Sequence, residues 1–151
     1  AGLDPRVYRD SGMQWAADGL AAASPDAGPE ALTSADAVDP LSDLLAVADA
    51  WGAEAIVSYD ALGGYRHPDH VLAHRLARAV ARGLELPFWE IVVQSAEAAP
   101  FEAHDVSPWL GRKLAALAAH ATQLTVEGDD IVHVGGQRQP VDQVEAFRRV
   151  E

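Results

Sequence analysis

The chain has 151 residues, of which 49% are hydrophobic, so residues 1–151 can form one domain with a buried core but not two ordinary domains. The formal net charge of −12 argues against nucleic acids and anionic membranes as partners, and no apolar run reaches the length of a membrane span. Because the chain contains no cysteine, disulfides, thiol catalysis and thiolate metal ligands are excluded, and we expect a reducing, cytoplasmic environment.

The first part of the chain predicts mostly irregular structure. A short lead-in ends in the segment Tyr8–Met13. Residues 16–39 are rich in Ala, Asp, Pro, Gly and Ser, which predicts a loop or lid. A helix is expected to follow, with Asp39 as its cap, Pro40 at its first position and Gly52 just past its end.

Helical and strand patterns alternate over the rest of the chain. Short apolar runs predict strands at 55–59, 88–93, 124–126 and 131–134. Apolar residues at helical spacing predict helices at about 68–83, 107–120 and 140–149. This alternation is typical of an α/β fold. Ligands of such sheets gather beyond the carboxyl ends of the strands, so we expect a site in the loop after the first strand.

The loop Asp60–His70 concentrates polar groups at that place. Two imidazoles and two carboxylates lie within its eleven residues. Gly63-Gly64 lets the backbone bend sharply, and Pro68 suits the start of a helix, so His67 and His70 should project from a rigid corner. A neutral imidazole is a natural zinc ligand, and a neighbouring carboxylate can orient it.

Two other interpretations of these residues stay open. Asp and His are ordinary residues at a helix start, so the cluster can also be structural. His70 and His74 are four positions apart, as in helical zinc pairs, but Val71 stands where a zincin needs its general-base Glu. We therefore expect His74 to be structural or to support a metal ligand.

The stretch Val57–His70 closely resembles the second signature of the LmbE-like zinc-dependent N-deacetylases, the family that includes the GlcNAc-phosphatidylinositol de-N-acetylases. Tyr8–Met13 resembles the substrate loop of the mycothiol-biosynthesis deacetylase branch, and Lys113–Gln123 resembles its late helix. These three segments fall in the family's order and touch most of the chain. The resemblance implies a Rossmann-like, mostly parallel sheet flanked by helices. It also implies zinc-dependent hydrolysis of an N-acetyl group from a glucosamine-containing conjugate.

The resemblance implies a role for each of five residues. His70 would be a metal ligand, and His67 would stabilise the oxyanion or act as general acid. Asp69 would tune His67 by hydrogen bonding. Tyr65 would help bind the substrate and stabilise the tetrahedral intermediate, and Asp10 would hydrogen-bond sugar hydroxyls.

One feature of the family is not found. Its first signature is a His-Pro-Asp-Asp-Glu-type loop that supplies metal ligands and the general base, whereas the only His-Pro of this chain is His67-Pro68. His70 alone cannot hold a catalytic zinc, which takes three protein ligands. We therefore expect a chain without the N-terminal strand–helix units and inactive in isolation. The alternatives are a mycothiol S-conjugate amidase of the same family and a non-catalytic sugar-binding module.

Overall fold

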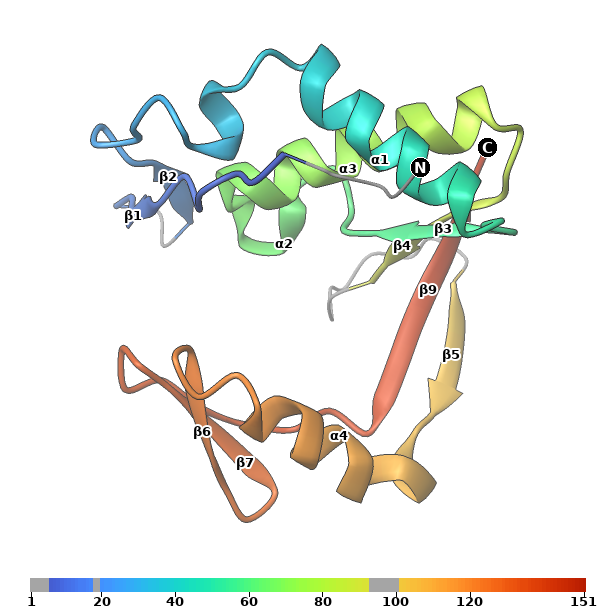
Figure 1. The fold of residues 1–151 in the computed structure, drawn as a ribbon. Helices are drawn as coiled ribbons and strands as arrows, with labels where there is room; N and C mark the ends of the chain where they lie inside the picture. The colour runs from blue at the N-terminus through green and yellow to red at the C-terminus, as the bar shows by residue number, and fades with distance from the viewer. Residues whose placement is uncertain (1–5, 18–19, 93–100) are drawn as a thin grey trace. The chain divides into compact units, whose positions relative to one another are not determined.

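The computed structural model describes residues 6–17, 20–92 and 101–151, and Figure 1 shows the course of the chain. It divides into a larger unit, Ala1–Phe101 with Phe147–Glu151, and a smaller unit, Glu102–Ala146. Each unit has a core of its own. Within the described ranges, no helix is long and apolar enough to cross a membrane. That residues 1–151 form one domain stays a prediction.

Helices and short strands follow one another along the larger unit (Figure 1). Its elements are β1 (Met13–Trp15), β2 (Ala21–Ala23), the 3₁₀ helix η1 (Leu32–Ser34), α1 (Val38–Ala50), β3 (Ile56–Ser58), α2 (Gly63–Arg66), α3 (Pro68–Gly83), β4 (Phe88–Ile91) and the end of β9 (Val144–Val150). The segment 16–39, expected to be a loop or lid, thus contains β2, η1 and the first residues of α1.

The larger unit packs two helices on one sheet. β3 runs parallel to β4, and β4 pairs antiparallel with β9. Buried residues of α3 and β4 form the core, Ala77, Ala81 and Phe88, against which Leu44, Ile56 and Val150 pack. The predicted α/β class is confirmed. The sheet is mixed rather than mostly parallel, because the strand beside β4 runs in the opposite direction.

The last element was wrongly predicted as a helix over 140–149. Residues Val144–Val150 form β9, with Phe88 opposite Val150 and Glu90 opposite Arg148. The local sequence favours a helix, but β4 presents an edge that needs a hydrogen-bonded partner. Tertiary pairing therefore overrides local propensity here.

Two helices were predicted more closely. α3 spans Pro68–Gly83 as expected, with Pro68 in its first turn. α1 begins at Val38, so Asp39 lies in the first turn and does not cap the helix. The N-cap residue is Ala37, which makes no side-chain cap, and Asp36 before it accepts a hydrogen bond from the Val38 amide at 3.0 Å. The cap was misplaced because the helix begins two residues before the predicted first position, Pro40.

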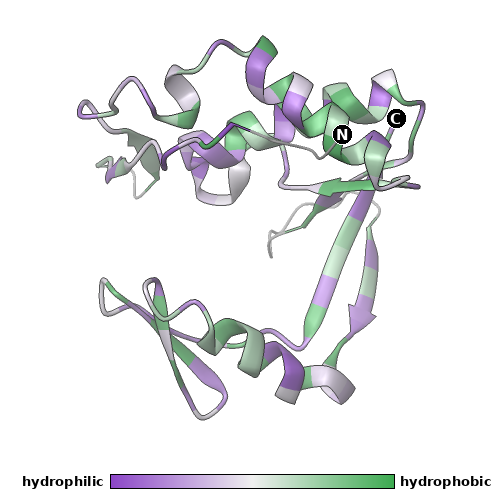
Figure 2. Ribbon diagram, in the orientation of Figure 1, coloured by the Kyte–Doolittle hydropathy of each residue, from purple (hydrophilic) through white to green (hydrophobic). Residues whose placement is uncertain are grey.

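The smaller unit packs one helix on a three-stranded antiparallel sheet. Its elements are β5 (Glu102–Asp105), the 3₁₀ helix η2 (Ser107–Trp109), α4 (Leu110–Ala118), β6 (Leu124–Glu127), β7 (Asp130–His133) and β8 (Arg138–Pro140). The core residues Leu124, Ile131 and Val141 receive the apolar face of α4, whose green segments are visible in Figure 2. The predicted helix 107–120 thus starts as a 3₁₀ turn, and both short strands are confirmed.

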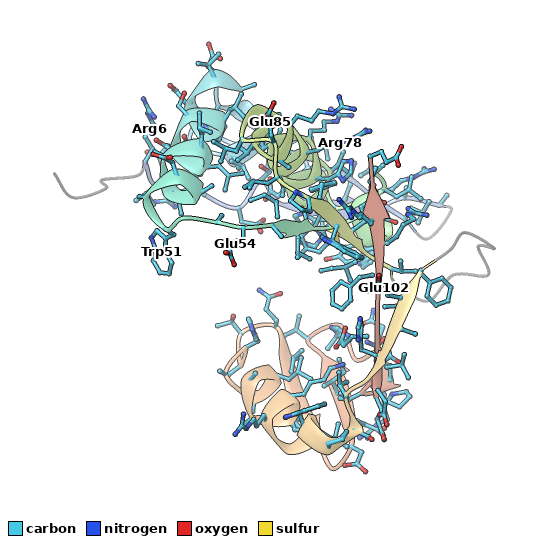
Figure 3. The ribbon with its side chains drawn as sticks, turned by 90° about the vertical axis from the view of Figure 1, so that its right-hand side faces the viewer. Arg6, Trp51, Glu54, Arg78, Glu85 and Glu102 are labelled. Carbon is cyan, nitrogen blue, oxygen red and sulfur yellow. The ribbon has the colours of Figure 1, made fainter. Side chains whose placement is uncertain are left out.

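The lead-in before β1 is fastened to α1. The guanidinium of Arg6 pairs with Asp39 at 3.2 Å and with Asp43 at 2.9 Å, and Figure 3 shows Arg6 beside this helix. The Tyr8 hydroxyl donates to the same Asp43 carboxylate at 2.9 Å. These contacts hold the segment that follows, Arg9–Gly12, in a defined place.

Candidate active site

The loop between β3 and α3 bends through two glycines. Gly63 and Gly64 have φ of +64° and +69°, which L side chains rarely adopt. A Cβ on Gly63 would lie 2.7 Å from the Val71 nitrogen and 2.9 Å from the His70 Cβ. The carboxylate of Asp60 accepts the Gly64 amide at 3.0 Å and steadies the turn. Glycine at position 63 therefore lets the loop lie directly against the start of α3.

His67 caps α3 with its own ring. It is only 8% exposed, and its Nδ1 accepts the amide hydrogen of Asp69 at 3.2 Å. In a neutral imidazole one nitrogen accepts and the other carries the proton. Because Nδ1 accepts here, the proton of neutral His67 lies on Nε2. That nitrogen is a hydrogen-bond donor, as a general acid or an oxyanion-binding group requires.

His70 has the opposite arrangement. Its Nδ1 lies 3.3 Å from the carbonyl oxygen of Gly63, which can only accept, so Nδ1 carries the proton. The lone pair is then on Nε2, as a metal ligand requires. Burial lowers the pKa of His70, as does the nearby His67, while the hydrogen bond to Gly63 partly opposes them. The neutral, ligand-competent form is therefore favoured.

Aromatic rings surround the two imidazoles. The Tyr59 ring stacks on His70, with ring centroids 4.0 Å apart and planes at 6°. Tyr65 meets both imidazoles edge-on, at 6.0 Å from His67 and 5.6 Å from His70. Burial raises the pKa of the Tyr65 phenol, so it remains a hydrogen-bond donor. Trp15 on β1 lies 5.7 Å from Tyr65 and is 57% exposed; the sequence carried no signal for its place here.

The predicted substrate loop meets the central motif. The Ser11 amide donates to Oδ2 of Asp69 at 2.9 Å, although the two residues are 58 positions apart. Ser11 is buried, and its Oγ accepts from the amide and hydroxyl of Thr33. Asp10 is thereby brought beside His67 and Asp69. The hydrogen bond between Asp69 and His67 comes from the main-chain amide of Asp69, while its carboxylate binds Ser11.

The contact between Ser11 and Asp69 brings together a candidate cation-binding group. Ligand atoms of Asp10, His67 and Asp69 lie within 4.8 Å of one another. Oδ1 of Asp69 is buried and finds no hydrogen-bond partner among the described residues, which is the kind of atom that a cation satisfies. Two carboxylates and an imidazole suit a divalent metal such as zinc. The tautomers nevertheless favour His70 over His67 as the imidazole ligand, because His67 has its proton on Nε2.

Buried polar groups continue from the site into the sheet. His74 is buried, and its Nδ1 lies 2.9 Å from the Tyr59 carbonyl oxygen. Its expected structural or supporting role agrees with this contact. Glu90 lies 3.6 Å from Nδ1 of His74 and pairs with the partly buried Arg148. Neither Glu90 nor Arg148 was predicted from the sequence, because nothing local to either residue indicates that they meet.

No protein-family model matches the chain. Curated relatives do, and three of them are named 1D-myo-inositol 2-acetamido-2-deoxy-alpha-D-glucopyranoside deacetylase. The protein of Kribbella flavida is 32% identical over 82% of this chain and 56% of its own length. The protein of Saccharomonospora viridis is 31% identical over 89% of this chain and 62% of its own length. The protein of Kineococcus radiotolerans is 30% identical over 97% of this chain and 54% of its own length. The chain belongs to the LmbE-like family.

The chain spans little more than half the length of these LmbE-like relatives. The alignment with the Kribbella protein covers 171 positions, more than the 151 residues of the whole chain. The relative therefore has segments inside the matched region that this LmbE-like chain lacks. The five predicted site residues nonetheless lie close together in the structure: Asp10, Tyr65, His67, Asp69 and His70.

Proposed function

We propose that this chain serves in the zinc-dependent removal of an N-acetyl group from a glucosamine-containing conjugate. The names of its relatives support an inositol-linked N-acetylglucosamine as the substrate class. The observation that carries the proposal is the opposite hydrogen bonding of the two imidazoles that follow β3: Nδ1 of His67 accepts an amide hydrogen, whereas Nδ1 of His70 faces a carbonyl oxygen. His70 presents a lone pair on Nε2, and His67 presents an N–H on the same ring atom. Hydrolysis of an amide at a metal needs one group of each kind.

His70 is the imidazole ligand in this proposal. A catalytic zinc takes three protein ligands. The carboxylates of Asp10 and Asp69 lie within 4.8 Å of a ring nitrogen of His67, and the ring of His67 is 4.6 Å from that of His70 between centroids, so these two carboxylates are the further donors in the proposal. When bound, the zinc would polarise the amide carbonyl and activate a water molecule. Asp10 is an exposed residue whose Oδ1 also accepts the Gly12 amide at 2.7 Å, and a carboxylate oxygen that does not bind the zinc suits a sugar hydroxyl.

Two donors serve the reacting amide. The Nε2–H of His67 stabilises the negative charge that develops on the carbonyl oxygen, or delivers a proton to the leaving amine. The Tyr65 hydroxyl, kept protonated by its raised pKa, donates to the substrate or to the tetrahedral intermediate. Asp69 fixes His67 through its main-chain amide and holds the substrate loop through its carboxylate.

Zinc calorimetry on the metal-free chain tests the metal site. We expect one zinc per chain, lost in His70→Ala and retained in the control His120→Ala, which removes an exposed histidine of the smaller unit. Asp69→Asn should weaken zinc binding if its buried Oδ1 is a ligand. Equal zinc affinity of His70→Ala and the unaltered chain would refute the assignment. Release of free amine from the inositol-linked substrate, with and without zinc, then tests the reaction.

The exposed pair of Trp15 and Tyr65 favours a second candidate, a non-catalytic sugar-binding module. Flat aromatic faces at the edge of a site are suited to the apolar side of a sugar ring. This candidate predicts that the substrate binds, and that Trp15→Ala weakens the binding, without any release of amine in the presence of zinc. Amine release that requires His70 excludes it.

A further inference from the structure

A buried carboxylate and a partly buried guanidinium join the last two strands of the larger unit. Glu90 on β4 is 5% exposed and stands opposite Arg148 on β9. Its Oε2 accepts from Nε of Arg148 at 3.1 Å and from Nη2 at 2.6 Å. Such a partner offsets the cost of burying a carboxylate. The antiparallel pairing of β4 and β9 supplies it.

The second oxygen of Glu90 lies toward His74. The distance from Oε1 to Nδ1 of His74 is 3.6 Å, and both side chains are almost fully buried. The same Nδ1 is 2.9 Å from the Tyr59 carbonyl oxygen, which only accepts, so Nδ1 carries the proton. At this distance the carboxylate makes no hydrogen bond to the N–H, but its negative charge beside the ring favours the tautomer with the proton on Nδ1.

Tyr59 connects this cluster to the candidate active site. Its carbonyl is held by His74, and its ring stacks on His70 at a centroid distance of 4.0 Å. His70 and His74 are four positions apart on α3 and therefore lie on one face of the helix. A shift of the Tyr59 backbone would move the ring that lies flat against His70.

We propose that His74, Glu90 and Arg148 are positioning residues that hold Tyr59 against His70 and so aim Nε2 of His70 at a divalent cation. The inference rests on the proposed function and goes beyond it, because it assigns a role to two buried residues and one partly buried arginine outside the reacting groups. Stability alone explains them poorly, because an ion pair that takes a carboxylate out of water is often no more stabilising than apolar residues of the same size.

Glu90→Gln removes the charge while keeping the shape of the side chain. The first measurement is the NMR spectrum of the metal-free chain, in which the stacked Tyr59 ring shifts the ring protons of His70 upfield. We expect Glu90→Gln to reduce this upfield shift. The second measurement is zinc affinity, which should fall about tenfold to a hundredfold, as is usual when the partner of a ligating histidine is lost.

Three variants separate positioning from simple destabilisation. Leu76→Ala removes a buried side chain of α3 outside the cluster, and it should lower the melting temperature while leaving the His70 shifts and zinc affinity unchanged. Tyr59→Phe keeps both the carbonyl and a stacked ring, and it should behave like the unaltered chain. Tyr59→Leu keeps only the carbonyl and should reproduce the effect of Glu90→Gln on zinc affinity.

Two outcomes would overturn the inference. One is a Glu90→Gln chain that folds with the original His70 shifts. The other is a Leu76→Ala chain whose melting temperature falls about as much as that of Glu90→Gln and whose His70 shifts change by the same amount. The NMR measurement needs no metal, so it tests the positioning role even if zinc binds elsewhere. If only the proposed function is wrong, the unaltered chain will show the expected upfield His70 shifts but will bind no zinc.

Discussion

The place of each imidazole on α3 decides which of its nitrogens is free. His67 stands before the first turn, where backbone amides lack partners, and its Nδ1 accepts one of them. His70 stands inside the helix and faces a loop carbonyl, to which its Nδ1 donates. Two identical side chains three positions apart thus acquire complementary hydrogen-bonding roles. Sequence spacing predicted the pair but not this division between them.

The lowered pKa of His70 has a consequence for pH dependence. Burial lowers this pKa below the ordinary histidine value of about 6.5. As pH falls, the unfolded chain therefore takes up the proton first. The stability that neutral His70 contributes is present above about pH 6.5 and is lost as pH falls through the lowered pKa. We expect zinc binding to persist below the pH at which an exposed histidine becomes charged.

An NMR titration of the metal-free chain checks this expectation, with free histidine as the reference. Because its pKa is lowered by burial, the His70 ring should change its shifts below the ordinary histidine value of about 6.5. In urea unfolding, the chain should lose stability between about pH 6.5 and the His70 midpoint, and His70→Gln should lose less. Titration of His70 at or above about pH 6.5 would contradict the described environment of the ring.

At the scale of elements, the turn α2 depends on its first glycine more than on its second. Both have positive φ, so alanine at either position is strained, by about 1–3 kcal/mol. Only at Gly63 would the new Cβ also collide with the start of α3, whereas the Cβ at Gly64 meets open space. We expect Gly63→Ala to lose far more stability than Gly64→Ala and to disturb His70.

Chemical denaturation and zinc calorimetry on the two glycine variants measure the difference. Gly64→Ala serves as the matched control, because it introduces the same methyl group at nearly the same φ. It should retain zinc binding, whereas Gly63→Ala should lose it. Similar stability and zinc affinity in both variants would show that the contact between the turn and α3 is not needed.

Elements differ in how far the sequence predicts them. α3 was placed correctly because Pro68 and the apolar spacing act within the helix itself. The strand β9 was missed because its residues suit a helix and become a strand only through pairing with β4. The cap of α1 was misplaced because the helix begins at Val38, two residues before the predicted first position, Pro40.

At the scale of the whole molecule, the two units have separate cores. Ile131 is buried in the smaller unit, so Ile131→Ala should destabilise that unit by about 2–5 kcal/mol. Phe88 is buried in the larger unit and touches the His74 ring, so Phe88→Ala should disturb the site as well as the core. Amide hydrogen exchange and the His70 ring shifts report the two effects. A change of the His70 shifts in Ile131→Ala would contradict the view that the two cores are separate.

The sequence by itself determined the family, the α/β class, the loop Asp60–His70 and the helix that follows it. These depend on residues close together in the chain, where spacing, glycine and proline act locally. Only the tertiary structure decided that Ser11 binds Asp69, that β9 is a strand and that Glu90 meets Arg148. Each of these contacts joins residues far apart in the chain. Such contacts form because buried polar groups need partners, and the sequence does not show which partner will be near.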